Sequence, residues 1–176
     1  KDDFIKETKD AVSEYFPNLK DNDDYTSIIN ESHYDRLKDL LDDAIEKGAS
    51  VDEINPSNED FSQQEFYKIP PTIVTNTTDD MKIMQEEIFG PLLPVVEYEE
   101  IDEATNLINS KDRPLGLYYF GSDKSEEDNV LNKTSSGGVT VNNVISHLQQ
   151  NDLSFGGVGP SGMGRYKSFE GFKNFS

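Results

Sequence analysis

The sequence contains no cysteine among its 176 residues. A disulfide framework, a thiolate metal site and a thiol nucleophile are therefore all excluded within these residues. Histidine is scarce as well: we interpret His33 as a surface residue in the first turn of a helix, and His147 has no second ligand at metal-binding spacing, so we expect no metal site. No apolar run approaches the length that spans a bilayer, and the first residues lack the pattern of a signal peptide.

Positive charge is the next shortage, with 16 Lys and Arg against 35 Asp and Glu and a net charge of −19. Residues 1–128 carry 33 of the acids and 12 of the bases, whereas residues 129–176 carry 2 acids and 4 bases. An acidic surface repels phosphate backbones and anionic lipids, so we expect neither a nucleic acid nor a membrane as partner. The near-neutral tail is where an anionic cofactor or a partner surface would be opposed least.

The length and the apolar content of 34% suit a single domain, which we predict to span residues 1–176. The sequence begins with Lys1 and stops at Ser176 without a closing signal. We interpret it as a segment of a longer protein, and whether that segment is a natural truncation or an expressed fragment stays open.

Two helices are predicted before residue 50. Residues 3–16 have an amphipathic pattern that Pro17 stops, with one apolar face made by Phe4, Thr8, Ala11, Val12, Tyr15 and Phe16. Residues 32–35 resemble a capping box that opens a second helix, and Gly48 terminates it. The apolar stripe of this second helix comprises Tyr34, Leu37, Leu41, Ala44 and Ile45. Residues 49–66 are predicted to form a surface loop with a short edge strand.

After residue 68 the pattern alternates between strands and helices. Residues 69–74 read as an extended segment that its prolines confine to an edge or a strand entrance. Strands are predicted over 92–98, 115–120 and 138–142, with a helix that Asp102 caps and another over 125–133. The alternation predicts an α/β fold, with a mostly parallel sheet of βαβ units flanked by helices. Residues 142–147 follow the last of these strands, at the sheet edge where function gathers.

The segment Glu86–Pro91 has the sequence Glu-Glu-Ile-Phe-Gly-Pro and precedes the apolar run 92–96. A carboxylate at the mouth of a strand can accept hydrogen bonds from a vicinal diol. Phe89 offers a flat apolar surface to a planar ring. A solvated acidic pair followed by a core phenylalanine is the alternative interpretation.

A glycine-rich segment covers residues 155–165, and Gly157, Gly159 and Gly162 match the pattern G-x-G-x-x-G. A dinucleotide-binding fingerprint must follow a strand and open a helix. Pro160 lies inside the pattern and no helical period follows, so we reject that interpretation. We predict instead a tight loop whose small residues let two backbone segments approach.

The order and spacing of these motifs resemble the C-terminal, catalytic-domain half of the aldehyde dehydrogenase superfamily. The resemblance covers nearly all of the chain and is carried by residues 86–91, 134–142 and 155–165, with support from 69–72 and 171–176. Residues 29–33, 134–142 and 144–147 are most similar to the branch with fatty and coniferyl aldehyde dehydrogenases. Ser154 replaces the usual Pro, and Asn143 replaces an Asp that is frequent in this branch.

The resemblance implies that the parent protein oxidises an aldehyde to a carboxylic acid. A cysteine thiolate attacks the aldehyde, hydride passes to NAD or NADP, and a thioester is hydrolysed by water that a Glu activates. By the same resemblance, Glu87 and Phe89 bind the cofactor, while Phe155 and Ile145 line the substrate tunnel. No catalytic residue falls within this chain. Glu86 is interpreted as structural, and Arg165 as a scaffold ion-pair partner.

The isolated chain is therefore expected to be inactive and to bind dinucleotides weakly at best. The resemblance further implies a cytoplasmic parent that forms a homo-oligomer, usually a dimer, and binds a small aldehyde. Two alternatives stay open: a truncated, non-catalytic relative that acts as an interaction or oligomerisation module, and a relative of the acyl-phosphate reductases.

Overall fold

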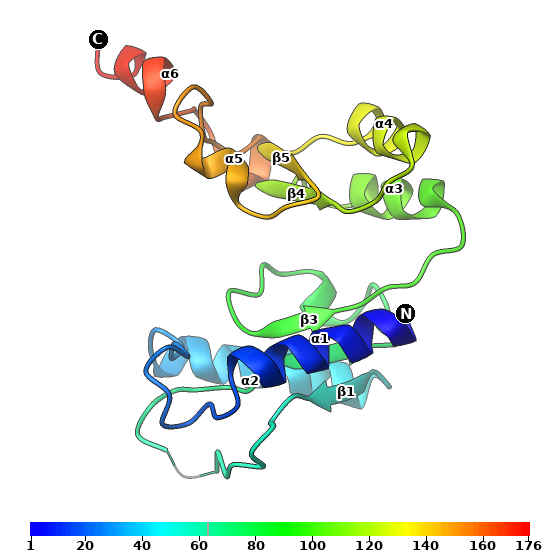
Figure 1. Ribbon diagram of the computed structural model, residues 1–176, viewed down its shortest axis with the longest axis vertical. Coiled ribbons are helices and arrows are strands. Elements are labelled where there is room, and N and C mark those ends of the chain that lie inside the picture. The colour runs from blue at the N-terminus through cyan, green and yellow to red at the C-terminus, as the bar shows by residue number, and fades with distance from the viewer. Residues whose placement is uncertain (63) are drawn as a thin grey trace. The chain divides into compact units, whose positions relative to one another are not determined.

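The computed structural model describes residues 1–62 and 64–176, which divide into two compact units, Lys1–Glu97 and Tyr98–Ser176 (Figure 1). Each unit contains its own sheet with helices beside it. Parallel strand pairs and helices occur in both units, so the α/β prediction is confirmed. None of the helices in the described ranges has the length and apolar character needed to cross a membrane.

The first unit has a three-stranded mixed sheet. Its elements are α1 (Asp2–Tyr15), α2 (Glu31–Glu46), β1 (Ser50–Glu53), β2 (Thr72–Thr75), the 3-10 turn η1 (Lys82–Met84) and β3 (Leu92–Pro94). Strand β2 is central, with β1 antiparallel on one side and β3 parallel on the other. Pro70 and Pro71 precede β2, so these prolines mark a strand entrance and not an edge. The edge strand predicted within residues 49–66 is β1.

A hydrophobic core joins α2 to this sheet. Leu37, Leu40 and Ala44 on α2 are buried with Val74 of β2 and Leu92 of β3. Three further side chains complete the buried cluster: Ile69, Met81 and Ile83. The predicted stripe was wrong at Ile45, which is 52% exposed, and it omitted Leu40. Leu40 lies on the inward face of α2 because positions 37, 40 and 44 are three or four residues apart and so share one side of a helix.

Two predicted details of this unit were wrong. Helix α2 begins at Glu31, because the side chain of Asn30 accepts a 3.0 Å hydrogen bond from the backbone N–H of His33 and caps the helix two residues before Ser32. Helix α1 forms as predicted; none of its residues is fully buried, but Ile5, Thr8 and Val12 are partly buried. Strand β3 ends at Pro94, well short of residue 98, although the N–H of Val95 still donates to the carbonyl of Val74 at 2.9 Å.

The second unit is built on one parallel strand pair. Its elements are α3 (Ile101–Ser110), β4 (Gly116–Tyr119), α4 (Lys124–Lys133), β5 (Gly138–Val141), α5 (Ser146–Gln149), the 3-10 turn η2 (Gly159–Ser161) and α6 (Ser168–Lys173). Helix α4 connects β4 to β5, which confirms the predicted βαβ unit. Asp123 caps α4 by accepting from the backbone of Ser125 and Glu126. Asp102 was predicted to cap α3, but the N-cap position is Glu100; Asp102 instead accepts from Asn129 and Lys133 of α4.

The glycine-rich segment packs backbone against backbone, as predicted. A Cβ on Gly137, just before β5, would lie 2.4 Å from the carbonyl oxygen of Gly156. A Cβ on Gly156 would lie 2.2 Å from the carbonyl oxygen of Gly164. Residues 159–161 form a single 3-10 turn, and no helix starts until Ser168. This context supports the rejection of the dinucleotide fingerprint.

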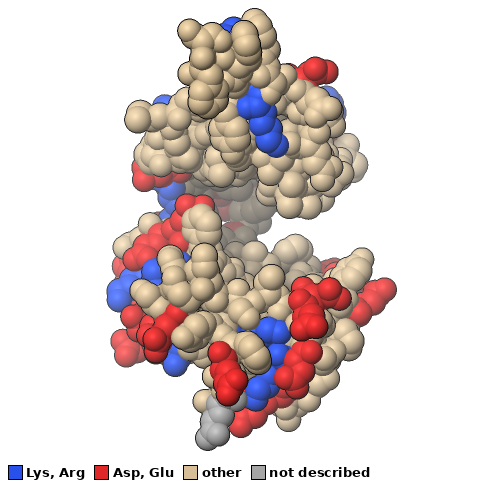
Figure 2. Space-filling view, turned by 90° about the vertical axis from the view of Figure 1, so that its left-hand side faces the viewer, with Lys and Arg blue, Asp and Glu red and all other residues tan. Residues whose placement is uncertain are grey.

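The two units differ in surface charge. Residues 1–97 hold 24 acids and 9 bases, whereas residues 98–176 hold 11 acids and 7 bases. On the face seen in Figure 2, charged atoms are dense over the first unit, while the part that ends in α6 is mostly uncharged. The acidic character predicted from composition is therefore concentrated on the unit that carries residues 86–91.

Candidate functional site

Arg36 of α2 holds the Glu86–Pro91 turn in place. Its guanidinium donates to the backbone carbonyl of Glu87 at 3.3 Å and to that of Ile88, and it lies 3.5 Å from the carboxylate of Glu86. The planar donors of one arginine thus fix two successive carbonyl groups and one side chain. Glu86 is structural, as predicted, and Arg36 is a residue that sequence reasoning missed.

The two predicted cofactor residues project from this fixed turn. Phe89 has a φ of 49° and its side chain is 76% exposed. A bulky residue in the left-handed region is rare and costs free energy, so the surrounding contacts must impose it. Gly90 allows the turn to lie against α2, because a Cβ there would come within 2.5 Å of a Leu37 methyl. The carboxylate of Glu87 is exposed and has no hydrogen-bond partner among residues 1–62 and 64–176.

A hollow of about 570 Å³ lies beside Phe89 in the same unit. Aromatic and aliphatic side chains form much of its wall, and its lining residues are Tyr25, Thr26, Ser27, Ile28, Ile29, His33, Phe89, Gly90 and Pro91. The hydroxyl of Tyr25 donates to the carbonyl of Ile69 at 2.5 Å, and burial raises the pKa of Tyr25 well above its usual value. Tyr25 is therefore neutral at physiological pH. A hollow of this size and character suits a flat ring with polar substituents.

The two predicted substrate residues lie in the second unit. Phe155 is partly buried and packs edge-on against Tyr166, with ring centroids 5.3 Å apart. Ile145 precedes α5, is 49% exposed and has a φ of 61°. Lys167 connects their segments, since its ammonium donates to the carbonyl of Leu148 in α5 at 2.6 Å and lies 5.8 Å from the centre of the Phe155 ring. Lys167 was not identified from the sequence.

The scaffold ion pair expected at Arg165 stays a prediction. No ion pair forms at its guanidinium within the described ranges. Its backbone carbonyl instead accepts a hydrogen bond from Asn174, and its Cα lies 3.1 Å from a Cβ placed on Gly156. Arg165 contributes to the glycine-rich loop through its main chain.

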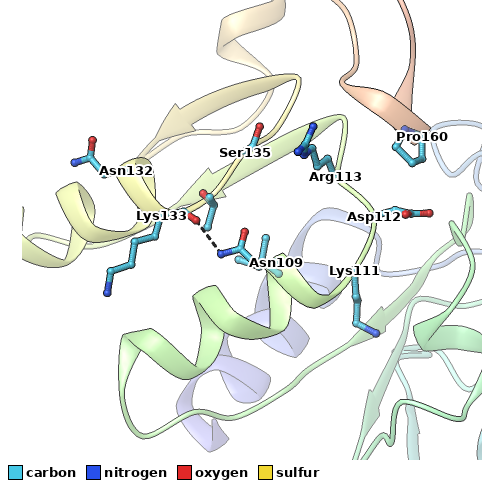
Figure 3. A pocket seen from close by; sticks show the side chains of 10 residues that line it. Asn109, Lys111, Asp112, Arg113, Asn132, Lys133, Ser135 and Pro160 are labelled. Carbon is cyan, nitrogen blue, oxygen red and sulfur yellow. Dashed lines mark hydrogen bonds between the residues drawn. The ribbon is translucent and has the colours of Figure 1, made fainter.

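A second hollow, of about 580 Å³, lies between the ends of α3 and α4 and contains three cations, Lys111, Arg113 and Lys133 (Figure 3). Lys133 pairs with Asp102 at 2.7 Å. Figure 3 shows the Lys111 and Lys133 side chains extending away from each other, so the three charges do not converge on one point. Lys111 and Lys133 also lie at helix C-termini, where cations stabilise the helix dipole. This hollow therefore lacks the geometry of an anion site.

Comparison with known proteins identifies the fold and its relatives. The family model described as "Aldehyde dehydrogenase family" matches residues 1–176. The chain belongs to this family. It is 59% identical over 173 residues to a probable coniferyl aldehyde dehydrogenase of Caulobacter vibrioides. The aligned region covers 98% of this chain and 36% of that protein. A coniferyl aldehyde dehydrogenase of a Pseudomonas species is 49% identical over 99% of this chain and 36% of its own length.

A solved structure of Staphylococcus aureus AldH in a substrate-bound state superposes with a TM-score of 0.88 at 38% identity, over 99% of this chain and 37% of that chain. The chain thus spans about a third of the length of the relatives that it matches. Membership of the family and the α/β fold are established by these matches, and the branch with coniferyl aldehyde dehydrogenases is the one predicted from the motifs.

Proposed function

We propose that this chain is part of the C-terminal, catalytic-domain half of an NAD- or NADP-dependent aldehyde dehydrogenase, and that both compact units belong to that domain. The observation that carries the proposal is the Arg36-held turn, which presents an unpaired Glu87 carboxylate and an exposed Phe89 ring beside a hollow. The order of the motifs along the chain supports the C-terminal placement.

The residues of the first unit fit a nicotinamide dinucleotide. The exposed carboxylate of Glu87 accepts hydrogen bonds from a ribose diol, and the Phe89 ring offers a flat apolar surface next to it. The cofactor supplies hydride acceptance when it is bound. The role of this chain is to orient the cofactor, because Arg36 and α2 fix the turn before any ligand arrives and so reduce the ordering cost of binding.

The substrate class that we propose is an aryl or long-chain aldehyde of the coniferyl or fatty type. Phe155 and Ile145 are apolar, and neither is fully buried by the described chain, so both have surface left for a bulky apolar substituent. The family resemblance of residues 134–147 supports the same class. Because these 176 residues contain no cysteine, we propose that the nucleophile comes from another part of the full-length protein.

The cofactor proposal is tested by titrating the full-length protein that contains this chain with the reduced cofactors, NADH and NADPH. The fluorescence of the nicotinamide ring reports binding. Glu87→Gln is expected to raise the Kd by about 10- to 100-fold, since a hydrogen bond to a charged group contributes about 1.5–3 kcal/mol. Glu86→Gln is the matched control: the neighbouring carboxylate faces Arg36, so its Kd should change little. Equal effects of the two substitutions would contradict the assignment of Glu87.

The aldehyde proposal is tested with a panel of coniferyl aldehyde, octanal and acetaldehyde. Higher kcat/KM for either bulky aldehyde than for acetaldehyde supports the proposed class. Reduction of an acyl phosphate without aldehyde oxidation would favour the acyl-phosphate reductase alternative. We further propose a cytoplasmic homo-oligomer, which cell fractionation and the sedimentation coefficient of the full-length protein test.

A further inference from the structure

The segment Asn142–His147, here called the 142–147 loop, leaves the carboxyl end of β5 in a conformation that its sequence does not favour. Asn142 and Ile145 both have positive φ, 53° and 61°. Asparagine tolerates the left-handed region, but a β-branched residue there is a genuine outlier. The loop therefore needs external contacts that impose this shape on it.

The first contact is a pair of hydrogen bonds between the side chain of Asn142, at the start of the loop, and the backbone of Gly121. The side-chain amide of Asn142 donates to the carbonyl of Gly121 and accepts from the N–H of the same residue, both at 2.9 Å. The backbone N–H of Asn142 also donates to the carbonyl of Tyr119 at 2.7 Å. These three bonds tie the end of β5 to the end of β4.

The second contact is made by His147 at the other end of the loop. Its Nδ1 lies 2.8 Å from the hydroxyl oxygen of Thr140, so the two groups share one hydrogen bond. The ring rests on Gly138, where a Cβ would come within 2.5 Å of the imidazole Cδ2. Gly116 is the register partner of Gly138, and Tyr118 is that of Thr140. These four residues share one face of the strand pair, and the imidazole covers it.

Between the two contacts, Val144 and Ile145 are each 49% exposed. Lys167 holds the far side of the segment through the carbonyl of Leu148 and reaches the ring of Phe155. A strained loop that is fixed at both ends and displays apolar side chains at the edge of a parallel strand pair is a preorganised surface. Strain of this kind persists where a site needs a defined shape.

We propose that His147 is a positioning residue. Its ring packs on Gly138 and shares a hydrogen bond with Thr140, and these contacts hold the 142–147 loop in its strained shape. The loop in turn presents Ile145 to the bulky end of the aldehyde. The inference rests on the proposed function and extends it to selectivity. His147 does not touch the reacting atoms; it acts through the loop.

The test uses two pairs of substitutions in the full-length protein. Thr140→Val removes the hydroxyl, while Thr140→Ser keeps it. His147→Gln moves the polar group away from Nδ1, while His147→Asn places an amide where Nδ1 lies. Thr140→Val and His147→Gln should lower kcat/KM for coniferyl aldehyde or octanal by about 10- to 100-fold, mainly through KM, because misplacement of a binding wall has effects of that size. Acetaldehyde turnover and the KM for the cofactor should change less than about twofold.

Thr140→Ser and His147→Asn should restore the selectivity for the bulky aldehydes. The double substitution Thr140→Val/His147→Gln should be no worse than either single one, because both remove the same bond. Gly138→Ala should reproduce the loss and should have no added effect in a His147→Ala background, since the atoms that its Cβ meets belong to His147. Equal losses for all three aldehydes, or additive losses, would overturn the positioning role.

Hydrogen exchange provides a readout that does not depend on catalysis. The backbone N–H of Leu148 donates to the carbonyl of Ile145 at 2.8 Å and reports on the shape of the loop. Its exchange should accelerate in Thr140→Val and His147→Gln but not in Thr140→Ser or His147→Asn. Unchanged exchange in the first two would overturn the inference. A wild-type protein that oxidises none of the aldehydes would refute the proposed function and, with it, the role of Ile145, while the exchange data would still decide what fixes the loop.

Discussion

Residues 1–97 contain eleven of the thirteen buried apolar side chains of the described chain, and residues 98–176 contain two, Tyr119 and Val130. The first unit is organised around α2, whose inward face packs on a three-stranded sheet. The second unit is organised by close backbone contacts between glycines and by polar links such as those of Asn142, Thr140 and Lys167.

This difference has a direct functional consequence. The Glu86–Pro91 turn lies on a hydrophobic core and needs one arginine to fix it, so the proposed cofactor residues are presented by a self-supporting unit. The proposed substrate residues lie on a two-stranded sheet, and a strand pair of this size is marginal without further packing. We therefore expect the second unit to be the less stable one in the 176-residue chain.

The largest expected effect comes from the core of the first unit. Leu37→Ala should lower the free energy of unfolding by about 2–5 kcal/mol, because it leaves a cavity between α2 and the sheet. Chemical denaturation of the 176-residue chain measures it. The comparison in the second unit is Leu131→Ala on α4, where the side chain is 37% exposed, and it should cost less than Leu37→Ala. Similar costs for the two leucines would remove the contrast between the units.

The next effect comes from the glycine contacts of the second unit. Gly137→Ala should destabilise that unit by about 1–3 kcal/mol, because the new methyl group meets two backbone carbonyl oxygens, those of Gly156 and Leu115. Hydrogen exchange of β4 and β5 amides is the measurement. Gly171→Ala on α6 is the control, since its Cβ meets nothing closer than 3.4 Å, and it should leave the exchange unchanged.

Tyr25 gives a smaller effect in the first unit. Tyr25→Phe removes the hydrogen bond to Ile69 and should cost about 1 kcal/mol. Because burial raises the pKa of Tyr25 in the folded state, wild-type stability from this group is complete below pH 10 and declines as the pH rises further. The difference between the two proteins should therefore shrink in denaturation curves measured above pH 10. A constant difference up to pH 12 would contradict this assignment.

The smallest effect is expected at the surface of the second unit. The hydrogen bond from Lys133, followed by that from Asn129, lowers the pKa of Asp102. The stability that this carboxylate contributes is present above its unfolded pKa near 3.8 and is lost as the pH falls through the lower folded value. Asp102→Asn should thus be slightly destabilising at pH 7, and thermal denaturation at pH 2 should no longer separate it from wild type. A difference that grows at low pH would show that another group is responsible.

The elements with strong periodicity were predictable from the sequence. Helices α1, α2, α3 and α4 and strands β4 and β5 form close to the predicted residues, since their patterns are long or are bounded by glycine and proline. Helix starts were less predictable: Asn30 and Asp123 cap the helices, and this depends on which side chain reaches a free N–H first. The antiparallel pairing of β1 with β2 depends on tertiary contacts that a local pattern does not encode.

The candidate site divides in the same way. The sequence motifs were enough to name four candidate residues: Glu87, Phe89, Phe155 and Ile145. Arg36 and Lys167 could not, because each donates to a backbone carbonyl that is distant in sequence, and such contacts leave no local signal. Thr140 could not either, because its bond to the His147 side chain depends on how the chain turns after β5. His147 was placed at the candidate site edge, but its contact with Thr140 was not predicted, and the glycines at 116 and 138 beneath its ring were visible only as strand residues.

The central claim is that the first unit contacts the cofactor and the second unit contacts the aldehyde. It is tested most directly by steady-state kinetics of two variants of the full-length protein, Phe89→Leu and Ile145→Ala, with cofactor and aldehyde varied in turn. The account predicts that Phe89→Leu raises the KM for the cofactor by about tenfold and leaves the preference among aldehydes unchanged. Ile145→Ala should alter the preference between coniferyl aldehyde and acetaldehyde by a similar factor and leave the cofactor KM unchanged. The reverse pattern, or equal changes of both parameters in both variants, would contradict it.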